Sequence, residues 1–277
     1  SLELNSNLYR CRVSGTCDPE AYSESAILTV LPNVTTNGQS FTECPGSTVY
    51  SVTVNEFIEI GAFSMALSFN ESVLSYTGYN SLHSNLSGGM FAINEADGKV
   101  YISWSNTIAV TIPNGSVLIE LLFDSSPGTS PMNWDTQTPG NCEYSNINGD
   151  VVYSTWNNGN LSFQQPPIIN THPQDRIIYG TGSTTFSSTA SGTGISYRWQ
   201  ESIDGGNNWT DLTNVSPYSG TTTTTLTINP VDNSLDGNLY RCRVSGTCNP
   251  IAYSDSALLT VTVDAIYTSV QNTNFSC

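Results

Sequence analysis

The sequence contains two nearly identical copies of a 23-residue segment, and this internal repeat constrains the architecture more than any other feature. Residues 8–30 read LYRCRVSGTCDPEAYSESAILTV and residues 239–261 read LYRCRVSGTCNPIAYSDSALLTV, with four differences. The copies lie 231 residues apart, so the 277 residues hold a little more than one period of a long repeat. We therefore expect the chain to begin inside one repeat unit and to end inside another.

The amino-acid composition favours β-structure over helix. Charged residues make up 11% of the chain and Lys99 is its only lysine, whereas helix surfaces usually carry Lys, Glu, Arg and Gln. Abundant Ser, Thr, Asn and Gly suit the solvent-facing sides and the turns of antiparallel sheets. Because 277 residues are too many for one small sandwich, we expect an all-β protein of tandem β-sandwiches.

The charge balance argues against two classes of partner. Seven basic and 23 acidic residues give a formal net charge of −16, which would repel the phosphates of nucleic acids and anionic membrane surfaces. No run of 18 apolar residues occurs, and we expect no membrane insertion. The acidity suits an extracellular protein, with calcium binding by loop carboxylates as the alternative explanation.

The seven cysteines predict disulfide bonds, and therefore an oxidising, extracellular location at the cell surface. Zinc is not expected, because there is no C-x-x-C motif and neither histidine lies at ligand spacing from a cysteine. The repeat indicates two equivalent short bridges and one long bridge: Cys11–Cys17, Cys242–Cys248 and Cys44–Cys142. Cys277 corresponds to Cys44, so we expect its partner to lie beyond the last residue.

Residues 166–262 carry a pattern that is typical of one family. Trp199 precedes a segment in which Asp236, Tyr240 and Cys242 keep the spacing D-x-G-x-Y-x-C. This pattern resembles the immunoglobulin (Ig) domain, whose tryptophan and tyrosine belong to the core between two sheets. Asn238 replaces the glycine of the pattern, and asparagine also tolerates a positive φ.

The Ig resemblance implies core positions for Trp199 and Tyr240, and for Tyr9 in the first copy of the repeat. The sequence departs from the family at Ser188, which stands where strand B would carry a cysteine, so the usual inter-sheet disulfide bond is not expected. The S-x-D-G-G-x-x-W motif at 202–209 is similar to the Ig-like modules of Bacteroidota surface proteins. We expect Trp209 to pack at the sheet edge, with ligand stacking as the alternative.

Residues 32–165 resemble a second family. The matching pieces are P-G-x-x-V at 45–49, F-x-x-x-L-x-F-x-x-x-V-L at 63–74, G-K-V-Y-I-S-W at 98–104 and L-I-E-L-L-F at 118–123. They are similar to the cohesin domain, which implies a nine-stranded jelly-roll sandwich. Since cohesins bind dockerins through one sheet face, two roles remain open for this unit, a spacer in an array or a receptor.

No catalytic motif stands out in the sequence. His83 lies in a polar loop and His172 precedes a proline, and neither accompanies a nucleophile or metal motif. Asp97, Asp150 and Asp204 lie in glycine-containing turns, but no D-x-D-x-D-G calcium loop occurs. We expect no enzyme and no cofactor, with calcium as the one ligand that these turn aspartates could bind.

These patterns divide the chain into four parts. They are the C-terminal hairpin of a preceding Ig-like domain at 1–31, a cohesin-like sandwich at 32–165, an Ig-like sandwich at 166–262 and the start of the next cohesin-like domain at 263–277. The order resembles tandem modules of giant Bacteroidota adhesins of the gliding or attachment type. It predicts a structural segment of a cell-surface stalk or filament. Its partners would be neighbouring repeats of the same polypeptide and, in a filament, other copies.

The alternative function is recognition of a surface glycan or a protein by the cohesin-like unit. Trp134 and Trp156 are the candidates for stacking on such a ligand, because we expect them to be exposed. A separate candidate modification site is Ser256, since the sequence Asp-Ser-Ala at 255–257 resembles the acceptor of Bacteroidota O-glycosylation.

Overall fold

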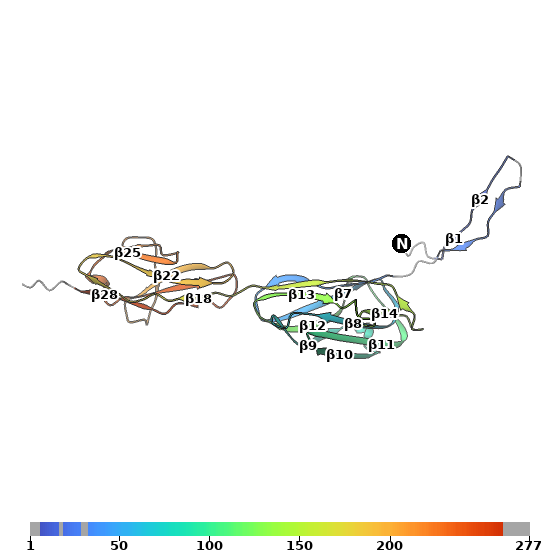
Figure 1. The fold of residues 1–277 in the computed structure, drawn as a ribbon, viewed down its shortest axis with the longest axis horizontal. Helices are drawn as coiled ribbons and strands as arrows, with labels where there is room; N and C mark the ends of the chain where they lie inside the picture. The colour runs from blue at the N-terminus through green and yellow to red at the C-terminus, as the bar shows by residue number, and fades with distance from the viewer. Residues whose placement is uncertain (1–5, 17–18, 29–32, 263–277) are drawn as a thin grey trace, which may run out of the picture. The chain divides into compact units, whose positions relative to one another are not determined.

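The computed structural model describes residues 6–16, 19–28 and 33–262. In these ranges the regular structure is β-strand, apart from two one-turn 3-10 helices, η2 (Ser84–Leu86) and η3 (Asn233–Leu235). The chain divides into two compact units, residues 1–163 and 164–277 (Figure 1). Each unit contains facing β-sheets, which confirms the predicted all-β class of β-sandwiches. The expected domain start at 263–277 lies outside the described residues, as do Cys17 and Cys277.

The first described residues form a β-hairpin. β1 (Leu8–Tyr9) pairs with β4 (Ala26–Ile27), and β2 (Arg12–Val13) pairs with β3 (Ala21–Tyr22). Tyr9 is 49% exposed in this hairpin, because a two-stranded ribbon has no second sheet of its own to bury a side chain. The core position of Tyr9 in a complete Ig-like domain stays a prediction.

Residues 33–163 form two sheets, here called the first sandwich. The larger sheet has the order β10-β11-β8-β13-β17-β6, with β14 paired to β8 and β15 to β14. Its strands are β6 (Ser40–Glu43), β8 (Phe57–Ser68), β10 (Met90–Ala96), β11 (Lys99–Ile112), β13 (Gly128–Trp134), β14 (Glu143–Ser145), β15 (Val151–Val152) and β17 (Gly159–Phe163). The smaller sheet has the order β16-β5-β7-β12-β9, from β5 (Val34–Asn37), β7 (Ser47–Asn55), β9 (Leu74–Leu82), β12 (Ser116–Ser125) and β16 (Ser154–Asn157). The pairs β16–β5 and β17–β6 are parallel.

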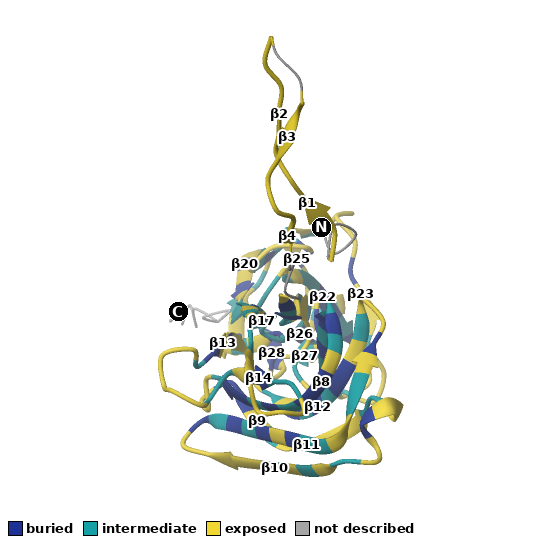
Figure 2. Cartoon of the chain, turned by 90° about the vertical axis from the view of Figure 1, so that its right-hand side faces the viewer, coloured by how far each residue is buried: buried dark blue, intermediate teal, exposed yellow. Residues whose placement is uncertain are grey.

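Alternating side chains of both sheets fill the core of the first sandwich. On β8, Phe63, Met65 and Leu67 are buried, while the residues between them belong to the other face of the sheet. Phe63 stacks on Trp104 of β11 with 5.6 Å between the ring centroids, and Tyr144 of β14 lies 6.0 Å from Phe63. Figure 2 shows this pattern as alternating buried and exposed bands along the strands. Burial of one such side chain contributes about 1.5–3 kcal/mol, so the aromatic layer is a main source of stability.

The second sandwich, residues 164–262, has the strand arrangement of an Ig domain. One sheet has the order β19-β28-β26-β22-β23 with β27 beside β26, and opposite it lie β20-β25-β24 and the pair β18-β21. The strands are β18 (Ile168–Thr171), β19 (Arg176–Tyr179), β20 (Gly182–Ser187), β21 (Thr189–Ser191), β22 (Ser196–Ser202), β23 (Thr210–Asp211), β24 (Tyr218–Ser219), β25 (Thr225–Val231), β26 (Leu239–Ser245), β27 (Ala252–Tyr253) and β28 (Ala257–Thr262). β22, β26 and β28 take the places of Ig strands C, F and G, whereas β25 and β24 take those of E and D.

The core of the second sandwich contains the two aromatic residues of the Ig pattern. Trp199 and Tyr240 are both fully buried. The indole N–H of Trp199 donates a hydrogen bond to the carbonyl oxygen of Thr223 (3.0 Å), and the hydroxyl of Tyr240 donates to Oε1 of Glu201 (2.8 Å). Phe186 of the opposite sheet stacks on Tyr240 with 5.0 Å between the centroids. Both hydrogen-bonding groups that enter this core are therefore satisfied.

The cysteines of the two repeat copies do not form the predicted short bridges. Cys11 and Cys242 are free, and Cys17 lies outside the described residues, whereas Cys248 takes part in a disulfide bond. The hairpin register explains the error, because Ser254 lies opposite Cys242. The backbone N–H of Cys242 donates to Oγ of Ser254 (2.8 Å), and the N–H of Ser254 donates to the carbonyl oxygen of Cys242 (2.8 Å). Cys248 instead lies in the loop beyond the end of β26.

The predicted long bridge from Cys44 to Cys142 is also wrong. Cys142 is free, whereas Cys44 takes part in a disulfide bond. Cys44 follows β6, which is aligned with the Gly128 end of β13, while Cys142 precedes β14 beyond the other end of β13. The length of β13 separates the two cysteines by about 20 Å, and a disulfide bond requires Cα atoms within about 7 Å. Burial raises the pKa of the Cys142 thiol to about 11.

Candidate functional site

The outward face of the larger sheet in the first sandwich carries two rows of mostly small side chains. The strand register places one row across β10, β11, β8, β14 and β15: Met90, Ser105, Ala62, Ser145 and Val151. The neighbouring row crosses β10, β11, β8 and β14: Ala92, Ser103, Ser64 and Glu143. Because side chains alternate along a strand, these positions point away from the core. The alanine and serine residues of both rows are here called the small-residue face.

Large rings support the small-residue face from the core side. Phe91, Trp104, Phe63 and Tyr144 lie in register on the same four strands, at the alternate positions. The indole N–H of Trp104 donates a hydrogen bond to the carbonyl oxygen of Leu86 at 2.8 Å, which fixes the orientation of that ring. The face therefore combines small, smooth side chains outside with packed aromatic rings inside, and such a layer deforms little when a partner docks.

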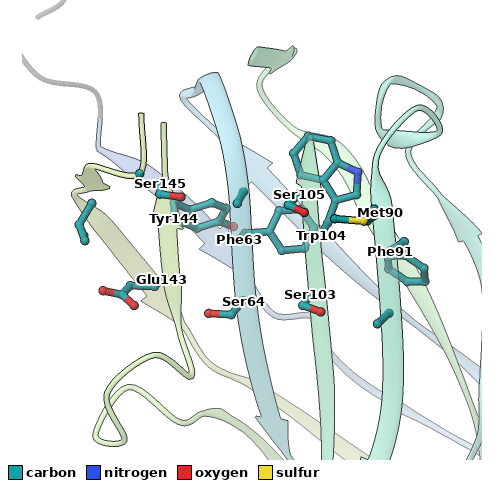
Figure 3. Close-up of a pocket in the computed structure, with 14 residues that line it drawn as sticks. Phe63, Ser64, Met90, Phe91, Ser103, Trp104, Ser105, Glu143, Tyr144 and Ser145 are labelled. Atoms are coloured by element: carbon teal, nitrogen blue, oxygen red, sulfur yellow. The ribbon is translucent and has the colours of Figure 1, made fainter. Parts of the chain in front are cut away.

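The small-residue face is hollowed and has apolar edges. A cavity of about 530 Å³ opens over it, and Figure 3 shows Ser64, Ser103 and Glu143 on neighbouring strands at one level of this hollow. At the β10 edge Met90 is 79% exposed, and at the β15 edge Val151 is 65% exposed. Glu143 adds a carboxylate between them. The result is a shallow trough with hydroxyl groups on its floor and apolar side chains at its edges.

A loop between β13 and β14 borders the trough and is held in place by Asp135. Its Oδ2 atom accepts hydrogen bonds from Nζ of Lys99 (2.7 Å) and Nδ2 of Asn141 (2.9 Å). These contacts, with Lys99 the strongest, hold the pKa of the Asp135 carboxyl well below its usual range. The hydroxyl of Ser64 donates to the carbonyl oxygen of Gly140, so the loop is also bonded to the trough floor.

The two histidines lie outside the trough. Nδ1 of His83 accepts a hydrogen bond from the N–H of Asn85 (3.2 Å), and Nδ1 of His172 accepts from the N–H of Asp255 (2.8 Å). Over the described ranges, no three His, Cys, Asp or Glu side chains form a group that could hold a metal ion. In the same ranges, no helix has the length and apolar character needed to cross a membrane.

The two tryptophans predicted to stack on a ligand are core residues instead. Trp134 is 5% exposed, and its indole N–H donates to the carbonyl oxygen of Asn157 (3.0 Å). Trp156 is half-buried, lies 5.2 Å from the Trp134 ring and stacks on Tyr144. Ser130, Met132 and Trp134 occupy alternate positions on β13 and all point inward, while Trp156 of β16 packs against the core through its two ring contacts. The prediction that both tryptophans are exposed is therefore wrong.

Ser256 is exposed in the turn before β28. This position leaves its hydroxyl accessible to a modifying enzyme. Glycosylation at Ser256 stays a prediction.

The small-residue face was missed in the sequence although a signal for it exists. The segments Ala62-Phe63-Ser64 on β8 and Ser103-Trp104-Ser105 on β11 alternate large and small residues. The large residues of this alternation predict the core, and the small residues between them define the opposite face of the sheet. Their alignment into rows depends on the register of strands that are distant in the chain.

Comparisons with known proteins assign no function to the chain. The sequence profile of a family described as "Domain of unknown function (DUF8696)" matches residues 169–265, and no curated protein matches the sequence.

Among solved structures, a non-cellulosomal cohesin from Archaeoglobus fulgidus is 15% identical and has a TM-score of 0.40, and the match covers 47% of this chain and 91% of the cohesin. The sixth cohesin of scaffoldin B from Acetivibrio cellulolyticus, solved with a dockerin, is 18% identical with a TM-score of 0.40, covering 48% and 99%. The two-Ig fragment of DIP-gamma is 13% identical with a TM-score of 0.42, covering 83% and 98%. The strand order, rather than these likenesses, defines the two sandwiches.

Proposed function

We propose that this chain is a non-catalytic, structural repeat segment of a secreted cell-surface adhesin, part of a stalk or filament that extends from the cell. The observation that carries the proposal is the internal repeat, in which 19 of 23 residues are identical across a spacing of 231 residues. Repetition of long units adds length to a polypeptide, because each further unit extends the array by one pair of sandwiches. A single binding site would not require a second copy.

The two sandwiches support a mechanical role. Their strands form continuous ladders of backbone hydrogen bonds, and these ladders resist extension of the chain. Cys44 and Cys248 each take part in a disulfide bond, which suits an oxidising location outside the cell. Charged residues make up only 11% of the chain, and its many uncharged polar residues suit prolonged exposure to the medium.

Imaging of the native protein by negative-stain electron microscopy tests the stalk. The expected result is a long thread with regular beads whose spacing corresponds to one pair of sandwiches. A compact particle of the full-length protein would contradict the stalk and would leave recognition as the remaining function.

A second function, recognition of a protein ligand, is favoured by the trough on the first sandwich. The small-residue face can approach a partner closely, and Met90 and Val151 provide exposed apolar contacts at its two edges. A Ser103→Arg substitution would fill the trough and abolish ligand capture. Ser75→Arg, on the exposed surface of the smaller sheet, is the matched control and should have no effect on capture. Equal behaviour of the two variants would exclude the trough.

A further inference from the structure

Basic residues are rare in this chain, and five of the seven belong to one part of the Ig-like fold. Arg241 and Arg243 lie on β26, and Arg198 lies on the neighbouring strand β22. Arg10 and Arg12 are the counterparts of Arg241 and Arg243 in the first copy of the repeat. In a chain with a net charge of −16, this concentration of arginine on two adjacent strands calls for a specific explanation.

The three arginines of the second sandwich lie close together. Arg198 of β22 and Arg243 of β26 are paired directly opposite each other. Arg241 lies two residues before Arg243, so its side chain is on the same face of β26. Like charges at directly opposed positions destabilise a sheet, so folding alone does not favour this arrangement. Asp211 pairs with Arg243 at 3.1 Å and leaves an excess of positive charge on the face. The arginine face is here defined as Arg198, Arg241, Arg243 and the rings of Trp209 and Tyr253.

Arg241 is held in one orientation. Its guanidinium carbon lies 4.1 Å from the centroid of the Trp209 ring and 4.5 Å from that of Tyr253, and its Nε–H donates to Oε1 of Gln200 (2.9 Å). Within the described part of the chain, its two terminal amino groups have no hydrogen-bond acceptor. A guanidinium fixed by two rings and one hydrogen bond loses little entropy when it binds an anion.

The same contact occurs in the first copy of the repeat. The guanidinium of Arg10 lies 4.3 Å from the centroid of the Tyr22 ring, at the positions equivalent to Arg241 and Tyr253. An array of such units would present one arginine face per repeat. A long polymeric anion could then bind several faces at once and gain avidity without any new contact.

We propose that the arginine face binds an anionic polysaccharide through the carboxylate groups of its uronic acid residues. A guanidinium binds a carboxylate with two parallel hydrogen bonds, and the terminal amino groups of Arg241 are free for such a pair. Tyr253 is 46% exposed, so part of its ring is available to the apolar side of a sugar. A uronic acid carries a carboxylate and an apolar ring face in one unit, which matches neighbouring guanidinium groups and aromatic rings. This inference holds with or without the stalk function.

The test measures binding of the whole chain to polygalacturonate by titration calorimetry at low and high salt. The Arg241→Gln substitution is expected to weaken binding about tenfold, because it removes the guanidinium group that is oriented to form two parallel hydrogen bonds with a carboxylate. Arg241→Lys should weaken binding as well, since lysine keeps the charge but cannot form two parallel bonds. Arg176→Gln is the matched control: its Nε–H donates to the carbonyl oxygen of Thr185 on the opposite sheet, so the same loss of charge should leave affinity within twofold.

The proposal is overturned if the unaltered chain does not bind polygalacturonate, or if it binds the fully methyl-esterified polymer as tightly as the free acid. It is also overturned if Arg176→Gln weakens binding as much as Arg241→Gln does. An affinity for polyglutamate equal to that for polygalacturonate would indicate an acidic protein partner instead of a polysaccharide. Thermal unfolding followed by tryptophan fluorescence checks that each variant is folded. Should Arg241→Gln not fold, Arg198→Gln replaces it, because this change leaves the rings around Arg241 in place.

Discussion

The two copies of the repeated segment form the same hairpin in different surroundings. Tyr240 pairs with Ala257 in the second sandwich, as Tyr9 pairs with Ala26 in the N-terminal hairpin. In both copies a serine lies opposite the cysteine and an arginine stacks on the tyrosine of the returning strand. Pairing register and these local contacts are therefore properties of the segment itself.

The two copies differ in how far their equivalent side chains are buried. Tyr240 and Val244 are 0% exposed, whereas the equivalent Tyr9 and Val13 are 49% and 62% exposed. In the second sandwich, Phe186 of the opposite sheet covers Tyr240. The same 23 residues therefore pair as a hairpin in both surroundings, while a core requires strands from distant parts of the chain.

The largest expected contrast comes from the same truncation in each copy. Tyr240→Ala should lower the free energy of unfolding of the second sandwich by about 3–5 kcal/mol, because it removes a buried ring and leaves a cavity. Tyr9→Ala should change stability by less than about 0.5 kcal/mol, as expected for an exposed site. Guanidinium denaturation of the full chain, followed by tryptophan fluorescence, measures both effects. Equal losses in the two variants would show that both copies are buried in solution.

Thiol reactivity provides the second contrast. Cys11 is free and exposed, whereas Cys242 is free and buried, and burial raises the pKa of the Cys242 thiol to about 11. Iodoacetamide at pH 8 should therefore modify Cys242 on the order of 100-fold more slowly than Cys11. A time course of peptide mass spectra measures the two rates. The peptides that contain Cys44 and Cys248 should remain unmodified until a reductant is added. Equal rates, or a disulfide bond at Cys242, would contradict the structure.

Removal of one hydroxyl group should give a smaller contrast. Tyr240→Phe removes a hydrogen bond to Glu201 and should cost about 1–2 kcal/mol, whereas Tyr9→Phe should have almost no effect. Glu201 keeps its contacts with Tyr218 and Asn238, so the variant should still fold. Urea unfolding of both variants at pH 7 measures the difference. Identical midpoints for Tyr240→Phe and the unaltered chain would contradict the role of this hydrogen bond.

The stability of the Tyr240→Phe variant should depend on alkaline pH differently from that of the unaltered chain. Burial raises the pKa of Tyr240 in the folded state above its ordinary value of 10.0. The protonated hydroxyl therefore contributes stability that is complete below pH 10 and is lost as the pH rises above it. Tyr240→Phe removes this titration, so its stability should fall less steeply above pH 10, as measured by urea midpoints across a pH series. An unchanged slope would assign the alkaline loss to other groups, such as Tyr218, whose pKa is also raised by burial.

The smallest expected effect comes from making the second copy resemble the first. Arg12 and Glu20 form an exposed ion pair at 3.7 Å, whereas the position equivalent to Glu20 is Ile251. Ile251→Glu would place a carboxylate near Arg243 and should change stability by less than about 0.5 kcal/mol, because exposed ion pairs are weak. Denaturation at low salt and at 1 M salt should show any gain disappearing in high salt. A change larger than 1 kcal/mol would show that Ile251 has a packing role.

Short-range patterns predicted two local features correctly, although they predicted the Cys242–Cys248 bridge wrongly. The sequence predicts a glycine-containing turn at Asp97, and Asp97 and Gly98 have φ values of 52° and 68°, as a tight turn between β10 and β11 requires. Ser188 was recognised as the replacement for an Ig cysteine, and its buried hydroxyl donates to the carbonyl oxygen of Thr171 at 2.9 Å. In each case the information lies within a few residues of the position concerned.

Short-range patterns do not predict which face of a strand the second sheet buries. Alternation along β13 shows that Met132 and Trp134 share a face, but it does not show which face the second sheet covers. The small-residue face has the same origin, since Ala62, Ser64 and Ser103 become neighbours only when β8 and β11 pair in one register.

Sequence patterns alone predicted the all-β class, the internal repeat and the existence of a hairpin in the first repeated segment, but not the register that places a serine opposite the cysteine. Only the tertiary structure decided that Cys142 and Cys242 are free, that Trp134 and Trp156 are core residues and that Tyr9 is exposed while Tyr240 is buried. The physical reason is the distance along the sequence over which each effect acts. Turn geometry and side-chain alternation act over a few residues, whereas burial and disulfide pairing depend on which distant strands become neighbours.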